Sequence, residues 1–307
     1  MNILLSSIVK EEDIIYMANA AKYCSLKLGG NFEYLVLPKS IDDFICYIIN
    51  LQHSNINFKV LGNMTNIVPR DGIIKGVFIS TKQIQSGIRV FQNRIIADCG
   101  TMLAAVCVSA KEHSLSGMEG LFGIPATVGG AIYNNAGAFG TEISNILESV
   151  LICKNGKIKS VDAKDIKFDY RFSQFQQDKS IILSATFLLS DGNKQDIWQK
   201  MQENMQKRKN SQPGLPSAGS VFKKYNNISA GYYIDRAGLK GLSCGDAKIS
   251  NIHANFIVNN VEATFKDFDY LASIIEQKVY EKFGILLQKE VEYLGENDES
   301  TSRLSHT

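Results

Sequence analysis

The sequence predicts an α+β protein with about two domains, and three observations support this prediction. The chain has 307 residues, a length that favours two domains over one. Apolar runs at 34–37 and 58–61 have strand length, and 41–52 between them has helical spacing, so this stretch has the pattern of a βαβ unit. Proline, glycine and polar residues fill 210–216 and mark a plausible boundary in the second half.

Further strands and a helix follow in the first half of the chain. Residues 77–80, 95–99 and 181–189 have the composition of strands. Four residues line one face of a predicted helix: Leu103, Val106, Cys107 and Ala110. The pair Asn155-Gly156 separates two strand-like runs, which predicts a β-hairpin over 149–161.

Two long helices are expected in the second half. Residues 196–209 form the first, with four side chains predicted to face inward: Ile197, Trp198, Met201 and Met205. Three cations near its C-terminal end suit the helix dipole: Lys207, Arg208 and Lys209. The second begins at Thr264 with a capping-box-like start at Asp267, ends at Gly284, and has an inward face that includes Phe268, Leu271, Ile275 and Val279.

These elements divide the chain into four predicted parts. A short N-terminal segment occupies 1–24, and a larger domain occupies 25–192, itself in two parts over about 25–82 and 83–192. A smaller domain covers 193–295, and a polar tail covers 296–307.

Composition excludes several classes of protein. A formal net charge of +2 gives no electrostatic basis for binding nucleic acid. The six cysteines contain no C-x-x-C pair, and with four histidines we expect neither a metal site nor a disulfide framework. No signal peptide and no apolar run of membrane-spanning length is recognisable, so we expect a cytoplasmic protein with no membrane partner. We also expect a monomer or weak oligomer.

Two glycine-containing segments are candidates for cofactor binding. Residues 116–140 hold seven glycines, and no charged residue lies between Glu119 and Glu142. Such backbone suits close approach to a large, partly apolar cofactor, although a buried glycine-rich turn is the alternative. The loop at 62–66 follows a strand and could hold a pyrophosphate, or be a plain turn. Neither segment contains the dinucleotide-binding G-x-G-x-x-G pattern or a P-loop.

Several polar residues are candidates for chemistry. Ser220 follows small residues that leave its hydroxyl accessible, and Lys223 nearby could bind a phosphate or carboxylate; the alternative is a serine in a turn. Arg171 lies between aromatic residues, which suits gripping a carboxylate, although a surface pair with Asp169 or Asp178 is equally compatible.

The end of the chain adds a predicted strand and a histidine segment. Residues 286–294 alternate, so that Glu290 and Glu292 share one face of a strand, where solvation is the simpler interpretation. His253 and Asn255 share a face if the chain is extended there, and His253 can be either structural or part of a site.

Taken together, seven motifs resemble the UDP-N-acetylenolpyruvoylglucosamine reductase family of bacterial peptidoglycan synthesis. They follow the family's order and span about residues 25–295: Leu61–Asn66, Gly123–Gly130, Asn135–Gly140, Tyr170–Arg171, Gly219–Lys223, Ala237–Gly241 and His253–Asn259. The resemblance implies an FAD-binding domain of the p-cresol methylhydroxylase/vanillyl-alcohol oxidase type plus a smaller C-terminal α/β substrate domain, in the shorter branch of the family.

The resemblance also implies a reaction and its site. Hydride passes from NADPH to non-covalently bound FAD, and then to UDP-N-acetylglucosamine enolpyruvate, which becomes UDP-N-acetylmuramate. Ser220 matches the proton donor, Arg171 the residue that faces the carboxylate, and Glu290 the catalytic carboxyl group. The implied cofactor-binding residues are Gly62, Asn63, Met64, Thr65, Asn66, Gly123, Ile124, Pro125, Thr127, Gly130, Asn134, Ala136 and Gly137. The implied substrate-binding residues are Tyr170, Lys223, His253 and Asn255.

The sequence departs from the family pattern at four positions. Met64 and Thr65 replace Gly and Ser in the first loop, and Lys248 and Ile252 replace the usual residues before His253. Two other hypotheses remain at this stage: a flavin oxidase of the same fold, and a non-catalytic flavin-binding module. Oxidases of this fold often tether FAD through His or Cys, and no His lies in either glycine-containing loop.

Overall fold

The computed structural model describes residues 5–85 and 87–296, which form two compact units. Within the described residues, unit 1 takes in the chain up to Ile15, Leu35–Thr65 and Val77–Gly214. Unit 2 takes in Tyr16–Tyr34, Asn66–Gly76 and the chain from Leu215. The predicted domain boundary at residue 193 therefore falls inside unit 1, because the helix that follows it packs there.

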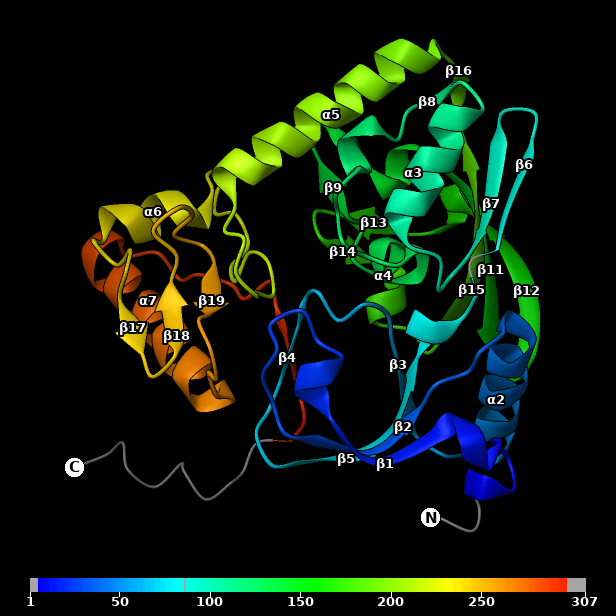
Figure 1. The fold of residues 1–307 in the computed structure, drawn as a ribbon, viewed down its shortest axis with the longest axis horizontal. Helices are drawn as coiled ribbons and strands as arrows, with labels where there is room; N and C mark the ends of the chain where they lie inside the picture. Colours follow the sequence, from blue (N-terminus) through cyan, green and yellow to red (C-terminus); the bar gives the residue numbers. More distant parts are fainter. Residues whose placement is uncertain (1–4, 86, 297–307) are drawn as a thin grey trace. The chain divides into compact units, whose positions relative to one another are not determined.

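Unit 1 contains a five-stranded antiparallel sheet in the order β12-β11-β15-β7-β6 (Figure 1). The strands are β6 Ile88–Phe91, β7 Arg94–Asp98, β11 Leu147–Lys154, β12 Lys157–Asp162 and β15 Ile181–Leu188. Helices α3 (Leu103–Glu112) and α4 (Val128–Tyr133) pack on β7, and α4 also packs on β15. The four residues predicted to line α3 are all buried, so that prediction is confirmed.

The predicted hairpin is present and is anchored by a helix. Asn155 and Gly156 have φ angles of 52° and 72°, and two positive φ angles in succession are what a type I′ turn requires. The backbone N–H of Gly156 donates to the Gln52 side chain of α2 (Ile41–His53) at 2.6 Å. This contact fixes α2 against the turn between β11 and β12.

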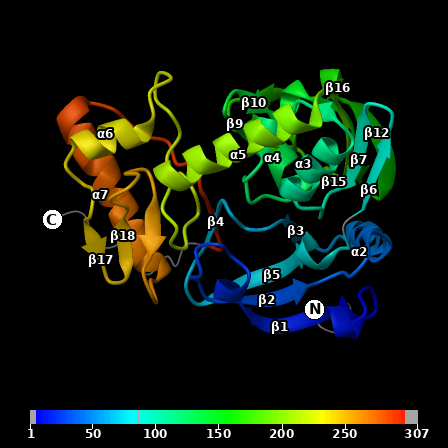
Figure 2. The same cartoon turned by 45° about the horizontal axis from the view of Figure 1, so that its top comes forward.

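Helix α5 (Lys194–Ser211) belongs to unit 1 and packs against α3 (Figure 2). Ile197 and Met201 are buried as predicted, but Trp198 is 39% exposed, so its predicted inward orientation is wrong. Its ring instead lies 6.3 Å from the Phe122 ring and 4.7 Å from Lys111 Nζ. An indole can rest on the surface in this way because its face also attracts a cation.

A second sheet has the strand order β1-β2-β5-β3. Its strands are β1 Ile14–Asn19, β2 Asn31–Val36, β3 Phe58–Leu61 and β5 Ile73–Ser80. The predicted strand, helix and strand are present as β2, α2 and β3, but β5 lies between the two strands and pairs with β3 in parallel. The division into units falls within β1, β2 and β5, so the chain passes between units along three strands.

Unit 2 is built around helix α7 (Phe265–Phe283). Strands β17 (Ser243–Cys244), β18 (Ala247–Ile249) and β19 (Ile257–Asn259) form an antiparallel sheet on which α7 packs, and α6 (Ala230–Arg236) also contacts α7. The predicted capping box is confirmed, with Asp267 N–H donating to Thr264 Oγ1 at 3.2 Å and Thr264 N–H donating to Asp267 at 2.9 Å. The helix ends at Gly284, whose φ is 69°.

Short elements complete the two units. The short strands are β4 Ile67–Pro69, β8 Leu115–Ser116, β9 Gly137–Ala138, β10 Thr141–Glu142, β13 Phe168–Asp169, β14 Phe172–Ser173, β16 Ser190–Asp191 and β20 Glu292–Leu294. The 3-10 helices are Glu11–Asp13, Ala20–Lys22, Thr81–Gln83, Glu119–Leu121, Ile143–Asn145, Ala163–Asp165 and Gln174–Gln176.

Two searches of the described chain gave negative results. Across residues 5–85 and 87–296, we find no helix with both the length and the apolar character that a membrane span needs. The same part of the chain holds no group of three or more His, Cys, Asp or Glu side chains placed to ligate a metal ion. Apart from Glu296, the predicted polar tail lies outside the described residues.

Candidate functional site

The two glycine-containing loops meet in unit 1. Gly62 follows β3 and packs against Thr127, the residue that caps α4, so closely that a Cβ on Gly62 would lie 2.5 Å from Thr127 Oγ1. Asn63 Nδ2 donates to the carbonyl of Pro125 at 2.7 Å. The two loops, predicted from separate motifs to bind one cofactor, therefore lie in contact with each other.

Met64 occupies the position where the family pattern has glycine. Its φ of 51° lies in the left-handed region, which costs a residue with a Cβ about 1–2 kcal/mol. The side chain is only 3% exposed, and burying a methionine contributes about 1.5–3 kcal/mol. Burial therefore offsets the backbone strain, and the bulk of Met64 lies within the protein.

The glycine-rich segment is held by an asparagine that the sequence analysis did not assign to the site. Asn135 is buried, and its side chain donates to Asp169 O at 3.1 Å and accepts from Ser144 N–H at 3.1 Å. The adjacent Asn134, which was predicted to bind the cofactor, donates to Gly130 O at 3.4 Å. The end of α4 is thereby joined to the strand that leads to Arg171.

Arg171 is half-buried and has a left-handed backbone, with φ at 54°. One terminal nitrogen donates to Gly137 O at 2.9 Å, and the guanidinium lies 5.0 Å from the Tyr170 ring centroid. The predicted stacking on an aromatic ring is therefore present. Asp178, one of the alternative partners, pairs instead with Lys154 at 3.4 Å.

In unit 2, the segments that carry Ser220 and Glu290 are hydrogen-bonded to each other. The carbonyl of Val221 accepts from Glu290 N–H at 2.7 Å, and Lys223 N–H donates to Gln288 O at 2.8 Å. Both Ser220 and Glu290 are half-buried. We call residues 220–223 and 288–291 the acid junction, because two predicted catalytic side chains adjoin one short backbone pairing.

The predicted strand over 286–294 is wrong in extent, since only Glu292–Leu294 form a strand, β20. The reason is a change of partner along the chain. Lys289 forms a bridge with Phe222, whereas β20 pairs with β4 in parallel. One run of alternating residues thus pairs with two different segments.

Two asparagines form hydrogen bonds with the backbone of the acid junction. Asn255 is buried, donates to Phe222 O at 2.8 Å and accepts from Phe222 N–H at 3.0 Å, all through its carboxamide. Asn66 Nδ2 donates to the carbonyl of Glu290 at 2.9 Å. Both carboxamides thus hold the backbone beside Ser220 and Glu290, and their predicted contacts with substrate and cofactor remain predictions.

We expect Asn255→Ala to destabilise the protein by about 1–3 kcal/mol for each of the two Phe222 backbone groups that lose a partner, because both are buried. Urea unfolding monitored by circular dichroism measures this. Asn251→Ala is the control, since Asn251 is exposed in the same region of unit 2. Equal stability of the two variants would contradict the role given to Asn255.

His253 and Asn255 do not lie on an extended strand, because the chain turns here. The backbone N–H of Asn255 donates to His253 Nδ1 at 3.2 Å, and Phe256 N–H donates to His253 O at 3.0 Å. Burial is the main cause that lowers the pKa of His253 below 6.5. A neutral imidazole whose Nδ1 accepts has an Nε2–H available as a donor. Lys223, the remaining predicted substrate residue, is half-buried.

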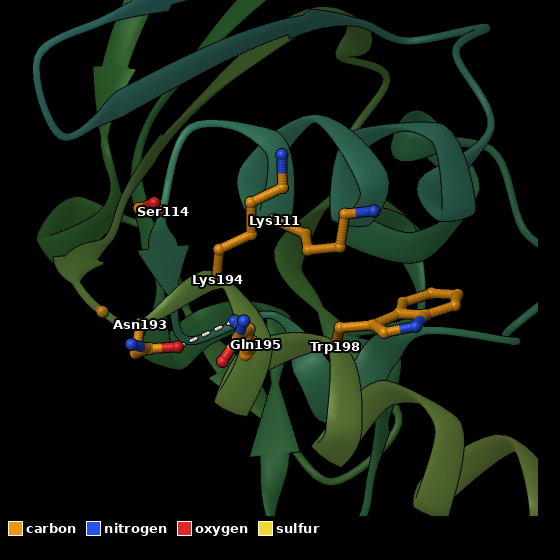
Figure 3. A pocket seen from close by; sticks show the side chains of 7 residues that line it. Lys111, Ser114, Asn193, Lys194, Gln195 and Trp198 are labelled. Atoms are coloured by element: carbon orange, nitrogen blue, oxygen red, sulfur yellow. Dashed lines mark hydrogen bonds between the residues drawn. The ribbon is translucent and has the colours of Figure 1, made fainter.

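A surface pocket of about 630 Å³ in unit 1 is lined by none of the predicted site residues. Figure 3 shows its lining, which is Lys111, Ser114, Gly192, Asn193, Lys194, Gln195 and Trp198. Its two lysines both pair with Glu112, and Asn193 caps α5. Both lysines and Asn193 thus have partners within the protein, and we assign no ligand to this pocket.

Comparison with known proteins gives a consistent result. The family model of an FAD binding domain matches residues 32–162, and that of the UDP-N-acetylenolpyruvoylglucosamine reductase C-terminal domain matches 210–294. Three relatives bear the name UDP-N-acetylenolpyruvoylglucosamine reductase. That of Caldicellulosiruptor saccharolyticus is 39% identical, with 89% of each chain covered. That of Carboxydothermus hydrogenoformans is 40% identical, covering 90% of this chain and 92% of the relative. That of Streptococcus pneumoniae is 39% identical, covering 93% and 95%.

A solved structure of the same family also has a similar fold. The crystal structure of UDP-N-acetylenolpyruvylglucosamine reductase from Thermus caldophilus is 31% identical, has a TM-score of 0.76, and is matched over 91% of this chain and 97% of that one. The predicted fold class, an FAD-binding domain followed by a smaller C-terminal domain, is therefore confirmed. The chain is an FAD-dependent oxidoreductase and belongs to the UDP-N-acetylenolpyruvoylglucosamine reductase family.

Proposed function

We propose that this chain reduces UDP-N-acetylglucosamine enolpyruvate to UDP-N-acetylmuramate at the expense of NADPH, in the cytoplasm. The names of its relatives support this substrate. The observation that carries the proposal is the acid junction, which sets Ser220 and Glu290 on one backbone pairing. All six cysteines are free thiols, which agrees with a reducing compartment.

The glycine-containing loops of unit 1 fit a flavin. A Cβ on Gly140 would meet nothing within 4 Å, and one on Gly130 would meet only Thr127 Oγ1, at 3.4 Å. The backbone is therefore open at Gly130, as a closely approaching cofactor would need, whereas Gly62, Gly129 and Gly137 pack against neighbouring atoms. We propose that residues 62–65 with 123–137 hold FAD non-covalently, and that Asn66 fixes the end of the first loop. When bound, FAD would supply the hydride transfer between NADPH and the enolpyruvyl group.

Residues of the chain would stabilise the negative charge that develops on the substrate and would supply the proton. Hydride addition to an enol ether conjugated to a carboxylate moves negative charge onto that carboxylate. Arg171, already oriented by Gly137 and Tyr170, would offer it a fixed guanidinium. Ser220 would deliver a proton from its hydroxyl to the adjacent carbon, and Glu290 would stabilise the developing enolate with its carboxyl group.

Anaerobic stopped-flow absorbance tests this function. The FAD-loaded protein is reduced with NADPH and then mixed with UDP-N-acetylglucosamine enolpyruvate. We expect the band of oxidised flavin to return rapidly and mass spectrometry to detect UDP-N-acetylmuramate. UDP-N-acetylglucosamine, which lacks the enolpyruvyl group, is the control and should not restore the band. A flavin that is reduced by NADPH but not reoxidised by the enolpyruvyl substrate would contradict the proposal.

A further inference from the structure

Arg208 differs from the other cations at the end of α5. Lys207 and Lys209 are exposed, as expected of side chains that only suit the helix dipole, whereas Arg208 is half-buried. Its Nε is buried and has no hydrogen-bond partner among the described residues. Its Nη1 donates only to a neutral group, the Gln212 side chain, at 3.2 Å.

The environment of Arg208 leaves its charge uncompensated. Burial lowers the pKa of the guanidinium, and no carboxylate of unit 1, as far as the structure describes it, forms an ion pair with this side chain. A charge that is partly removed from water without a charged partner is destabilising. Proteins retain such groups at functional sites, where a ligand completes the pairing.

The guanidinium lies against the glycine-rich segment. Nε is 3.4 Å from the position that a Cβ on Gly123 would take, and Cζ is 5.7 Å from the Phe139 ring centroid. Phe139 is 45% exposed and has a φ of 50°. The segment between Glu119 and Glu142 has no charged residue of its own, so Arg208 brings a cation to it from a distant part of the sequence.

We propose that Arg208 binds negative charge on FAD held by the glycine-rich segment. This inference rests on the FAD site proposed above. Neither family model covers Arg208, because one ends at residue 162 and the other begins at 210. FAD carries negative charge in two places, on its diphosphate and, after reduction, around N1 and the C2 carbonyl of the ring. The planar guanidinium suits both.

Arg208→Gln tests the proposal, with Lys209→Gln as the matched control that removes an exposed cation from the next position. The FAD dissociation constant is measured by titrating each apoprotein, and the midpoint potential by spectroelectrochemistry. If Arg208 binds the diphosphate, oxidised FAD should bind about 10- to 100-fold more weakly, as expected for loss of hydrogen bonds to a charged group. If Arg208 binds the reduced ring, the affinity for oxidised FAD should be unchanged and the midpoint potential of the flavin should fall. Lys209→Gln should resemble the parent in both measurements.

Thermal unfolding separates a ligand role from a structural one. Removing an unpaired buried charge should leave the apoprotein at least as stable as the parent, while the stabilisation gained on adding FAD should shrink. An Arg208→Gln variant that matches Lys209→Gln in FAD affinity and in potential would overturn the proposal, as would an apoprotein that no longer folds.

None of these measurements needs the enolpyruvyl substrate. If Arg208→Gln changes FAD affinity or potential but the parent protein does not reduce the enolpyruvyl substrate, only the proposed function is refuted. If the parent protein reduces the substrate but Arg208→Gln changes neither FAD affinity nor potential, only this inference is refuted.

Discussion

Ser220→Ala should lower the rate of substrate reduction by about 10²- to 10⁴-fold, the range that a positioned proton donor contributes. The loss should be confined to one half of the reaction. Bleaching of the flavin band by NADPH should proceed as in the parent protein, because no proton from Ser220 is needed there. Return of the band with the enolpyruvyl substrate should slow, and stopped-flow absorbance measures the two steps separately.

Ser217→Ala is the control for Ser220. Ser217 is also half-buried in unit 2, and the carbonyl rather than the hydroxyl of Ser217 accepts from Ser25 at 2.7 Å. This variant should keep both rates. If Ser220→Ala reduces the substrate at the parental rate, or if both half-reactions slow equally, Ser220 is not the proton donor.

Arg171→Lys should lower kcat/KM by about 10²- to 10³-fold, as removal of a preorganised group that stabilises developing charge does elsewhere. The charge is retained in this variant, but the planar fork that reaches Gly137 O and stacks on Tyr170 is lost. Steady-state kinetics with varied enolpyruvyl substrate measures the loss. We expect most of it in kcat, because the negative charge on the carboxylate grows in the transition state.

Lys167→Gln provides the comparison for Arg171, since it removes an exposed cation four residues earlier. It should leave kcat/KM within about twofold of the parent value, because isolated exposed charges contribute little. If only the net positive charge of this region mattered, Lys167→Gln, which removes a charge, would lower kcat/KM more than Arg171→Lys, which keeps it. That outcome would contradict the role proposed for Arg171.

Elements whose signals are local were predicted well. The capping box at Thr264, the glycine that ends α7, and the Asn155-Gly156 turn each depend on residues a few positions apart, and all three are present. The same holds for the motifs that suggested the family, because each is a short run of residues.

Features that depend on distant partners could not be predicted. The position of β5 between β2 and β3 is set by pairing across the sheet, which local composition does not encode. Trp198 is spaced in the sequence as if it shared a helix face with buried residues, yet its ring lies at the surface against Lys111. The contacts of Asn255 with Phe222 were not predicted, because a short polar motif does not reveal that the Phe222 backbone lies opposite.

Unit 2 is built from three separate segments of the chain, and this affects when it can fold during synthesis. Asn259 donates to the carbonyls of Leu26 and Lys27, more than 230 positions back, and Asp71 accepts from the first N–H groups of α7. During translation, residues 16–34 and 66–76 leave the ribosome long before the strands and helix that cover them are synthesised. Unit 2 therefore completes its folding late in synthesis, and a fragment that begins at residue 210 would lack two of its three parts.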